Sequence, residues 1–219
     1  MAKTYGAVNL LSSFGFSHLW RKACIRELSP QSHHRCADLM CGMGEATTIM
    51  AKVAGHSPRI DAIDFCPEMI KRCHRTVSRY LMVGVSVYTW DVFDLPSVPT
   101  YDRICCSFGL KTLSDEQLQQ FARLIRATLK PSGRASFVEI HVPENRLLRL
   151  GYLFYIRHVI PAIGRLCLGN PNCYRYLALY TEDYAKRDFF DKYLRQVGLV
   201  VSTHTLFFGC AKLYVADLA

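Results

Sequence analysis

The sequence predicts an α/β protein with a parallel, doubly wound sheet, and two patterns carry this prediction. From Arg35 to Ala216, short apolar runs typical of buried strands alternate with amphipathic stretches typical of helices. Glycine and proline residues stand at the junctions between these segments. The length of 219 residues suits one domain, and no internal repeat is evident.

Each element follows from a local pattern. Residues 35–40 form an apolar run that stops at the glycine turn 41–44, so a buried strand is expected to enter a tight loop. Pro67 suits the first turn of a helix, where its missing N–H has no helical partner. Ser114 and Gln117 have the spacing of a capping box, and a Lys-Pro-Ser-Gly turn at 130–133 is expected to close that helix. The last two runs are expected to pair as an antiparallel hairpin, which gives a seven-stranded, mostly parallel sheet with an antiparallel last strand. The expected strands are 35–40, 59–63, 83–88, 101–107, 134–140, 199–207 and 210–215, and the expected helices are 45–54, 67–80, 114–129 and 182–197.

Residues 145–181 depart from this alternation, because they combine five arginines and many apolar side chains with no acidic residue. A membrane span over 147–168 is rejected, since each central arginine costs about 2.5 kcal/mol or more to insert. Two functional interpretations stay open. The segment is either a helical lid over an apolar pocket, whose arginines hold an acidic substrate group, or a surface that lies on anionic lipid. A solvated basic face is the plain alternative.

The overall charge is basic, with 27 lysines and arginines against 18 acidic residues and a net charge of +9. Such a surplus suits nucleic acid, anionic lipid or an acidic small molecule as partner. The 50% hydrophobic content excludes a disordered protein. The 10 cysteines lack metal-site spacing and follow no signal peptide, so reduced thiols, no metal and a cytoplasmic location are expected.

The most informative stretch is 37–45, which reads Ala-Asp-Leu-Met-Cys-Gly-Met-Gly-Glu. Gly42 and Gly44 allow the chain to turn sharply and a ligand to approach the backbone closely. Asp64 ends the second strand 20 residues past Gly44, where a carboxylate can accept both ribose hydroxyls of an adenosine. Asp91 follows the third strand and suits an adenine amino group. These residues predict a nucleotide site at the carboxyl edge of the sheet.

Two nucleotide cofactors compete for this layout. A dinucleotide fingerprint needs a third glycine, but Thr47 occupies that place. Glu45 would also repel a pyrophosphate at the start of the helix. S-adenosylmethionine carries no phosphate, and its ammonium group suits an acid such as Asp38. The balance favours S-adenosylmethionine.

Longer stretches then resemble class I S-adenosylmethionine-dependent methyltransferases, and more narrowly the UbiE-type ubiquinone/menaquinone C-methyltransferases. The glycine loop and the motif Asp-Phe-Cys-Pro-Glu-Met at 64–69 are shared by many such enzymes. The pieces Phe-Gly-Leu-Lys at 108–111 and Tyr-Arg-Tyr-Leu at 174–177 are more specific to the UbiE branch. The other matching stretches are 5–9, 13–21, 129–133 with Glu139, and 161–164.

The resemblance implies one Rossmann-like methyltransferase domain over residues 1–219 that binds S-adenosylmethionine. An N-terminal cap is expected at 1–34, the Rossmann-like core at 35–143 and 182–219, and a basic, apolar lid at 144–181. The cofactor-binding residues that it implies are Tyr5, Asp38, Met40, Gly42, Gly44, Asp64, Phe65, Met69, Asp91, Val92 and Ser107.

This sequence departs from the family pattern mainly at positions that face the substrate in the family. Gly6 stands where an aspartate is usual, and His141 stands near a usual serine. Lys111-Thr112 replaces an Arg-Asn pair, and Tyr180-Thr181 replaces a Ser-Ile step. The fold and the cofactor are therefore expected to carry over more directly than the substrate.

The candidate catalytic residues follow the fourth and fifth strands. Methylation of carbon needs an electron-rich carbon, which forms when a neighbouring enol or phenol oxygen loses its proton. Lys111 is the candidate cation beside that oxygen, His141 is the candidate base, and Glu139 would orient either one. A surface lysine and a hydrogen-bonded loop histidine are the plain alternatives. The resemblance also suggests that Phe108, Tyr152, Tyr174 and Tyr176 line the substrate cavity.

The leading hypothesis is a C-methyltransferase that acts on an apolar, prenylated or aromatic small molecule such as a quinone precursor. The alternatives are a C- or O-methyltransferase for a terpenoid, polyketide or alkaloid, and a non-catalytic S-adenosylmethionine-binding protein. Nucleic acid is not expected as substrate, because Ser107-Phe-Gly-Leu stands where amino-methylating enzymes carry [ND]-P-P-[YF]. A peripheral contact with the inner face of a membrane and a homodimer are left open.

Overall fold

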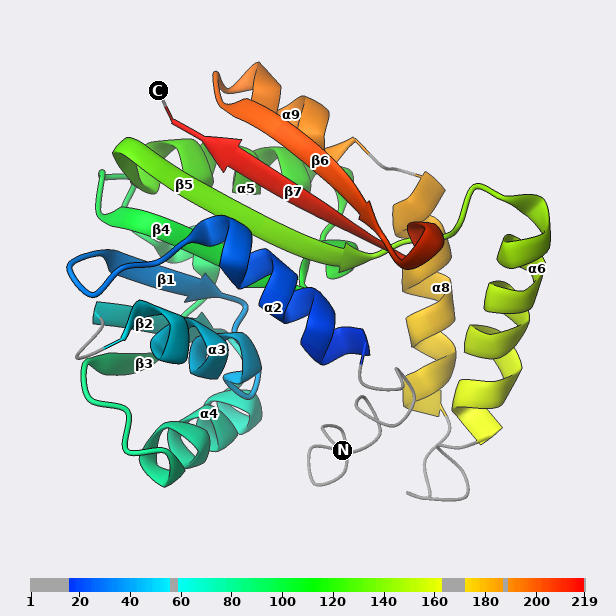
Figure 1. The fold of residues 1–219 in the computed structure, drawn as a ribbon, viewed down its shortest axis with the longest axis horizontal. Helices are drawn as coiled ribbons and strands as arrows, with labels where there is room; N and C mark the ends of the chain where they lie inside the picture. Colours follow the sequence, from blue (N-terminus) through cyan, green and yellow to red (C-terminus); the bar gives the residue numbers. More distant parts are fainter. Residues whose placement is uncertain (1–15, 56–58, 163–171, 187–188, 219) are drawn as a thin grey trace.

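The computed structural model describes residues 16–55, 59–162, 172–186 and 189–218, except for the side chains of residues 172–178. A central sheet runs through the molecule, helices cover it, and a helical pair stands beyond one edge (Figure 1). The predicted Tyr5 lies outside the described residues, as do the side chains of Tyr174 and Tyr176.

The sheet has seven strands in the order β3-β2-β1-β4-β5-β7-β6. β7 runs antiparallel to both of its neighbours, and the remaining pairs are parallel. The predicted α/β class, the mostly parallel sheet and the closing hairpin are therefore confirmed. The strands are β1 (Arg35–Leu39), β2 (Arg59–Asp64), β3 (Val85–Thr89), β4 (Tyr101–Ser107), β5 (Leu129–Ile140), β6 (Val200–Leu206) and β7 (Ala211–Asp217).

Helices pack on both faces of the sheet and bury two separate apolar clusters. Adjacent residues of β4 show this division, because the buried Cys105 side chain joins one cluster and the buried Cys106 side chain joins the other. One face carries α2 (Phe16–Leu28), α3 (Glu45–Ala54) and α4 (Pro67–Arg79), and the other carries α5 (Asp115–Thr128) and α9 (Phe190–Gln196). Short 3₁₀ turns are η1 (Val92–Asp94), η2 (Leu110–Thr112) and η4 (Phe207–Gly209).

An aromatic group anchors the α5–α9 face. The rings of Phe137 and Phe190 meet edge to face at a centroid distance of 5.1 Å, and Phe121 lies 6.0 Å from Phe137. All three side chains are fully buried. Burial of each ring contributes about 1.5–3 kcal/mol to stability, so this group fixes α5 and α9 against the sheet.

The segment that was predicted as a lid forms a helical pair beyond the carboxyl edge. That it covers a substrate stays a prediction, and we use the name lid for this pair. It consists of α6 (Arg146–Phe154), which continues into the π-helical turn η3 (Tyr155–Val159), and of α8 (Asn172–Lys186). In Figure 1 these two helices stand beside the end of β5, where the other parallel strands also point. Among the described residues, no helix is both long and apolar enough to cross a membrane.

Two predicted elements were wrong. The expected helix 182–197 is two helices, because Tyr184 and Phe190 both enter the same core. Side chains six positions apart lie about 120° away from each other around a helix, so one straight helix could not bury both. The predicted lid boundary at residue 181 therefore falls inside α8. The expected turn at 130–133 belongs to β5, which starts at Leu129 with an irregular register beside Tyr101.

Eight cysteines have side chains that the structure describes, and all eight are free thiols. Cys24, Cys105 and Cys106 are almost fully buried, and burial raises the pKa of each thiol, to about 12 for Cys24. These side chains therefore act as small apolar groups of the core.

Candidate active site

The glycine loop and the end of β2 are held together by one carboxylate. Asp64 Oδ2 accepts a hydrogen bond from the backbone N–H of Gly42 at 2.9 Å, and Oδ1 accepts one from the N–H of Cys66 at 2.9 Å. Asp64 is buried, with 7% of its surface exposed. Each carboxylate oxygen has two acceptor sites, so one site on each oxygen is left for a ribose hydroxyl.

The loop glycines are needed for different reasons. Gly42 has a φ of +57°, and a Cβ there would meet no atom within 4 Å, so its face is open to a ligand. Gly44 has a φ of +83°, and a Cβ there would lie 2.8 Å from Cys73 Sγ, so α4 packs directly on its backbone. This cradle, with Asp64 beside it, fits the adenosine and methionine parts of S-adenosylmethionine.

Asp38 lies beneath the loop and is fully buried. Its Oδ2 accepts a 2.6 Å hydrogen bond from the Thr47 hydroxyl, and its Oδ1 accepts a 3.3 Å hydrogen bond from the Cys105 thiol. Burial raises the pKa of this carboxyl to about 6, while the two hydrogen bonds oppose the shift. These bonds tie β1 to α3 and β4, and direct contact between Asp38 and a cofactor ammonium stays a prediction.

The other predicted cofactor residues surround the same edge. Phe65 projects into solvent with 69% of its surface exposed, and Val92 is buried in the core. Asp91 is exposed and accepts a hydrogen bond from the N–H of Phe93 at 3.0 Å, which caps η1. Met40 has a φ of 56°, a strained conformation for a residue with a side chain. Met69 and Ser107 are half-buried.

At the catalytic end, Lys111 and Glu139 form a buried ion pair. Lys111 Nζ lies 3.0 Å from Glu139 Oε1 and donates a second hydrogen bond to the carbonyl of Phe108. Glu139 is fully buried and also accepts the backbone N–H groups of Lys111 and Ile140, at 3.0 and 2.8 Å. Two predicted catalytic residues are thus in contact, and the lysine is held in place rather than free at the surface.

Two cations approach the Phe108 ring. The residue's φ of 64° is strained, and its ring centroid lies 4.7 Å from Arg21 Cζ and 5.7 Å from Lys111 Nζ. Trp20, 6.4 Å from the Phe108 ring, extends the aromatic surface toward Phe16. The strand end therefore presents an aromatic ring with positive charge close to it.

Sequence reasoning missed Arg21, Trp20 and the aromatic turn at Phe207. The Phe16 and Phe207 rings are 4.0 Å apart, and Phe207 and Phe208 both have positive φ values, 45° and 56°. The sequence signal for Arg21 was the Trp-Arg pair in the stretch 13–21, which contributed only to the family resemblance. Residue 207 was expected to end a strand, whereas it begins the strained turn η4.

His141 lies in a different small cavity of about 360 Å³, with Arg149, Glu182 and Lys186 among its lining residues. Its Nδ1 is 3.0 Å from the carbonyl oxygen of Val142. Neither Lys111 nor Phe108 lines this cavity. The structure therefore brings Lys111, Glu139 and Phe108 together, whereas none of these three lines the cavity beside His141.

The lid contributes Tyr152, which packs between the lid and the sheet. Burial raises the pKa of Tyr152 well above its ordinary value, and the Glu139 charge adds to the shift. On the lid surface, Arg157 pairs with Glu182, with a 2.7 Å bond from Nε. The apolar face of α6 is exposed, as shown by Leu147, Leu150 and Phe154 at 81%, 68% and 62%.

Comparisons with known proteins show which family the chain resembles. A model described as the ubiE/COQ5 methyltransferase family matches residues 1–216. A demethylmenaquinone methyltransferase of Thermotoga maritima is 27% identical, with 100% of this chain and 93% of that protein covered. A ubiquinone/menaquinone biosynthesis C-methyltransferase UbiE of Pseudoalteromonas translucida is 26% identical, with 93% and 81% covered.

The fold has a counterpart among solved structures. A SAM-dependent methyltransferase from Aquifex aeolicus superposes with a TM-score of 0.63 at 17% identity, covering 91% of this chain and 89% of that one. This likeness confirms the predicted Rossmann-like methyltransferase fold. The family match extends over almost the whole chain, and the glycine loop with Asp64 fits the cofactor. The chain therefore belongs to the ubiE/COQ5 methyltransferase family and is a methyltransferase that uses S-adenosylmethionine.

Proposed function

We propose that this enzyme methylates a ring carbon of an apolar, aromatic quinone precursor, in a cytoplasmic setting. The observation that carries the proposal is the Phe108 ring at the carboxyl edge of the sheet, which both Arg21 and Lys111 approach. The names of the relatives support the same substrate class, because they methylate demethylmenaquinone or serve ubiquinone and menaquinone biosynthesis.

The chemistry divides between cofactor and protein. Bound S-adenosylmethionine supplies an electrophilic methyl group. The protein must hold an acceptor carbon in line with that group, which can lower the barrier by several kcal/mol through proximity. An aromatic ring stacked near Phe108 would be oriented by the Trp20 and Phe108 rings.

The cations act on the acceptor oxygen. When a phenol or enol oxygen beside the acceptor carbon loses its proton, the negative charge favours attack from that carbon. Arg21 and Lys111 stabilise such an oxyanion, and Glu139 fixes the position of Lys111 Nζ. A water molecule or His141 would take the proton.

The exposed surface of the lid favours the hypothesis of an apolar substrate. The exposed α6 side chains Leu147, Leu150 and Phe154 share one helical face next to Arg146 and Arg149. Such a face suits a prenyl chain or the headgroup region of a membrane. Vesicle co-sedimentation of a Leu147→Asn/Leu150→Asn variant, compared with the parent, tests the membrane part of the proposal.

The direct test incubates the purified enzyme with S-adenosylmethionine and a short-chain demethylmenaquinol, and identifies the product by mass spectrometry and NMR. A new ring C–methyl group supports the proposal. An O–methyl product, or turnover of a terpenoid, polyketide or alkaloid phenol but not of the quinol, would assign the enzyme to the alternative substrate class. Binding of the cofactor without turnover of any acceptor would support a non-catalytic protein.

A further inference from the structure

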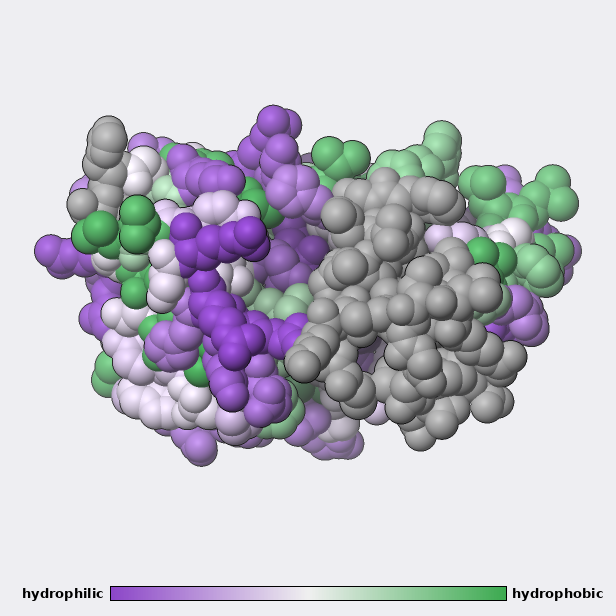
Figure 2. Space-filling view, turned by 90° about the horizontal axis from the view of Figure 1, so that it is seen from below, coloured by the Kyte–Doolittle hydropathy of each residue, from purple (hydrophilic) through white to green (hydrophobic). Residues whose placement is uncertain are grey.

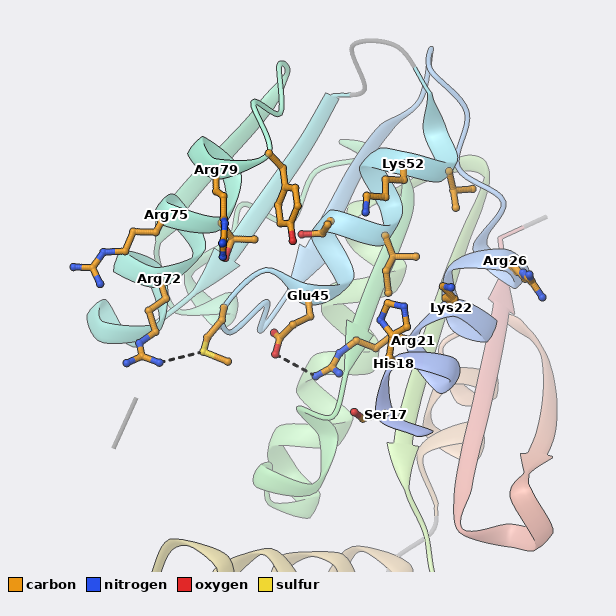
Figure 3. A pocket seen from close by; sticks show the side chains of 16 residues that line it. Ser17, His18, Arg21, Lys22, Arg26, Glu45, Lys52, Arg72, Arg75 and Arg79 are labelled. Atoms are coloured by element: carbon orange, nitrogen blue, oxygen red, sulfur yellow. Dashed lines mark hydrogen bonds and ion pairs between the residues drawn. The ribbon is translucent and has the colours of Figure 1, made fainter. Parts of the chain in front are cut away.

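A hollow of about 840 Å³ is lined by residues of α2, α3 and α4, and neither Lys111 nor Glu139 is among them. Arg21, which also contacts Phe108, is the lining residue that it shares with the candidate active site. Figure 3 shows basic side chains from all three helices around the hollow: Arg21, Lys52 and Arg79 lie toward its middle, whereas Arg26 and Arg75 point outward at its two ends. We refer to this hollow as the basic groove. Its positively charged lining residues are Arg21, Lys22, Arg26, Lys52, Arg72, Arg75 and Arg79.

The basic groove is strongly unbalanced in charge. Among the described residues, Glu45 is the one acid that lines it, and it contacts Arg21 at a loose 3.9 Å. Within the described residues, this is the one ion pair that the groove cations form. Arg72 donates to the thioether of Met43 at 3.5 Å, and Lys52 lies 5.3 Å from the centre of the Tyr80 ring. The groove therefore holds seven cations with almost no internal neutralisation.

The helical spacing of these residues explains why they converge. Arg72, Arg75 and Arg79 recur every three or four residues and so follow one face of α4. Lys22 and Arg26 are four residues apart on α2 and face the same hollow. In Figure 2, which views the molecule from the α4 side, strongly hydrophilic side chains gather over this end of the surface. Like charges at such spacing repel each other, so the arrangement costs stability unless an anion is bound.

Two further observations suit an anion in the basic groove: one concerns its positive potential and the other an unsatisfied hydrogen-bond donor. His18, at the rim, has its pKa lowered by partial burial and by the nearby charges of Lys22, Arg21 and Lys52. Arg21 is 8% exposed, and its Nε is buried with no hydrogen-bond partner among the described residues. A buried, unsatisfied guanidinium nitrogen is costly, so it marks a place where an acceptor oxygen would be gained.

The chemistry and size of the groove restrict its ligand. Guanidinium groups bind phosphate oxygens through two parallel hydrogen bonds, and lysine adds a point charge. The volume lies within the range of small-molecule sites, roughly 300–1,000 Å³. Several cations around one hollow also match more than one phosphate charge. We propose that the basic groove binds a phosphate-bearing anion that carries at least two negative charges, such as a diphosphate or an anionic lipid headgroup.

The test measures binding of inorganic pyrophosphate and tripolyphosphate by isothermal titration calorimetry at several salt concentrations. The groove variant is Arg75→Glu with Arg79→Glu, two exposed residues of which Arg79 lies in the last turn of α4. The matched control is Arg123→Glu with Arg126→Glu, also exposed, with Arg126 in the last turn of α5. Both variants change the net charge equally, and circular dichroism checks that both remain folded.

We expect the parent and the control variant to bind the polyphosphates, and the groove variant to bind about tenfold or more weakly. A second arm uses vesicles of phosphatidylcholine with cardiolipin, whose headgroup carries two phosphates. If the parent binds vesicles but not polyphosphates, and the groove variant does not bind vesicles, the phosphate belongs to a lipid headgroup. Equal affinities in the two variants would overturn the proposal. Tighter, groove-dependent binding of single-stranded RNA than of tripolyphosphate would also overturn it, because the ligand would then be a nucleic acid.

Discussion

Replacement of Lys111 by methionine should destabilise the fold by about 3–5 kcal/mol. Glu139 is fully buried, and Lys111 Nζ, 3.0 Å away, is the cation that neutralises it. Methionine fills a similar volume but leaves the carboxylate with two backbone N–H donors and no counter-charge. Removal of one partner from a buried ion pair usually costs that amount of free energy of unfolding. For a domain of this size, the melting temperature should fall by roughly 6–20 °C.

Urea denaturation followed by far-UV circular dichroism measures this change. Two variants separate charge from shape. Lys111→Arg keeps the cation, so its free energy of unfolding should stay near that of the parent. Lys111→Met combined with Glu139→Gln removes both charges, so it should recover more than half of the loss, because no unpaired charge is then buried.

The outcome bears directly on the role of Lys111. A Lys111→Met variant within about 1 kcal/mol of the parent would refute the argument that this pair supports the carboxyl edge, since the buried carboxylate would then tolerate the loss of its cation. A double variant as unstable as the single one would show that lost packing, not charge, is responsible.

Three further changes probe the cofactor loop. Burial raises the pKa of Asp38 to about 6, so the parent loses stability as the pH rises from about 4 through 6. Asp38→Asn should therefore be more stable than the parent by up to about 3 kcal/mol at pH 8 and equal near pH 4; the same difference at both pH values would contradict this. Asp64→Ala should weaken S-adenosylmethionine binding about tenfold or more in calorimetry, and unchanged affinity would refute the cofactor assignment. Gly44→Ala should cost about 1–3 kcal/mol in urea denaturation, because its Cβ would meet Cys73.

Local patterns were sufficient for most of the fold. The alternation of apolar strands and capped helices predicted five parallel strands and the closing hairpin, because each pattern depends on neighbouring residues alone. The capping box at Ser114 and Gln117 is present as predicted. The break between α8 and α9 was not predictable in this way. It depends on Tyr184 and Phe190 entering one core, which is a property of the assembled sheet.

The distribution of charge also depends on the assembled fold and could not be predicted from local patterns. The sequence of residues 145–181 holds five arginines and no acid, so a count along the chain places much of the basic surplus there. In the structure, Arg157 of this segment pairs with Glu182, which follows it directly. The net charge of the predicted Rossmann-like core is closer to zero in such a count, because its acids offset its bases in number. In the structure, acids such as Asp61 and Asp102 pair elsewhere, and the cations of three helices converge on the basic groove. A count along the chain cannot reveal which charges share a face.

The two cations at Phe108 differ in how firmly the protein holds them. Lys111 gives two hydrogen bonds to Phe108 and Glu139, so its position is fixed. Among the described residues, Arg21 forms one ion pair, the loose 3.9 Å contact with Glu45, and its Nε has no hydrogen-bond partner. In the proposed reaction, an oxyanion is best stabilised by donors that are already in place and still free to bond. Lys111 meets the first condition and Arg21 the second, so the pair together, rather than Lys111 alone, is suited to hold the acceptor oxygen. Their proximity arises because α2 packs across the end of β4, a contact that no local sequence pattern encodes.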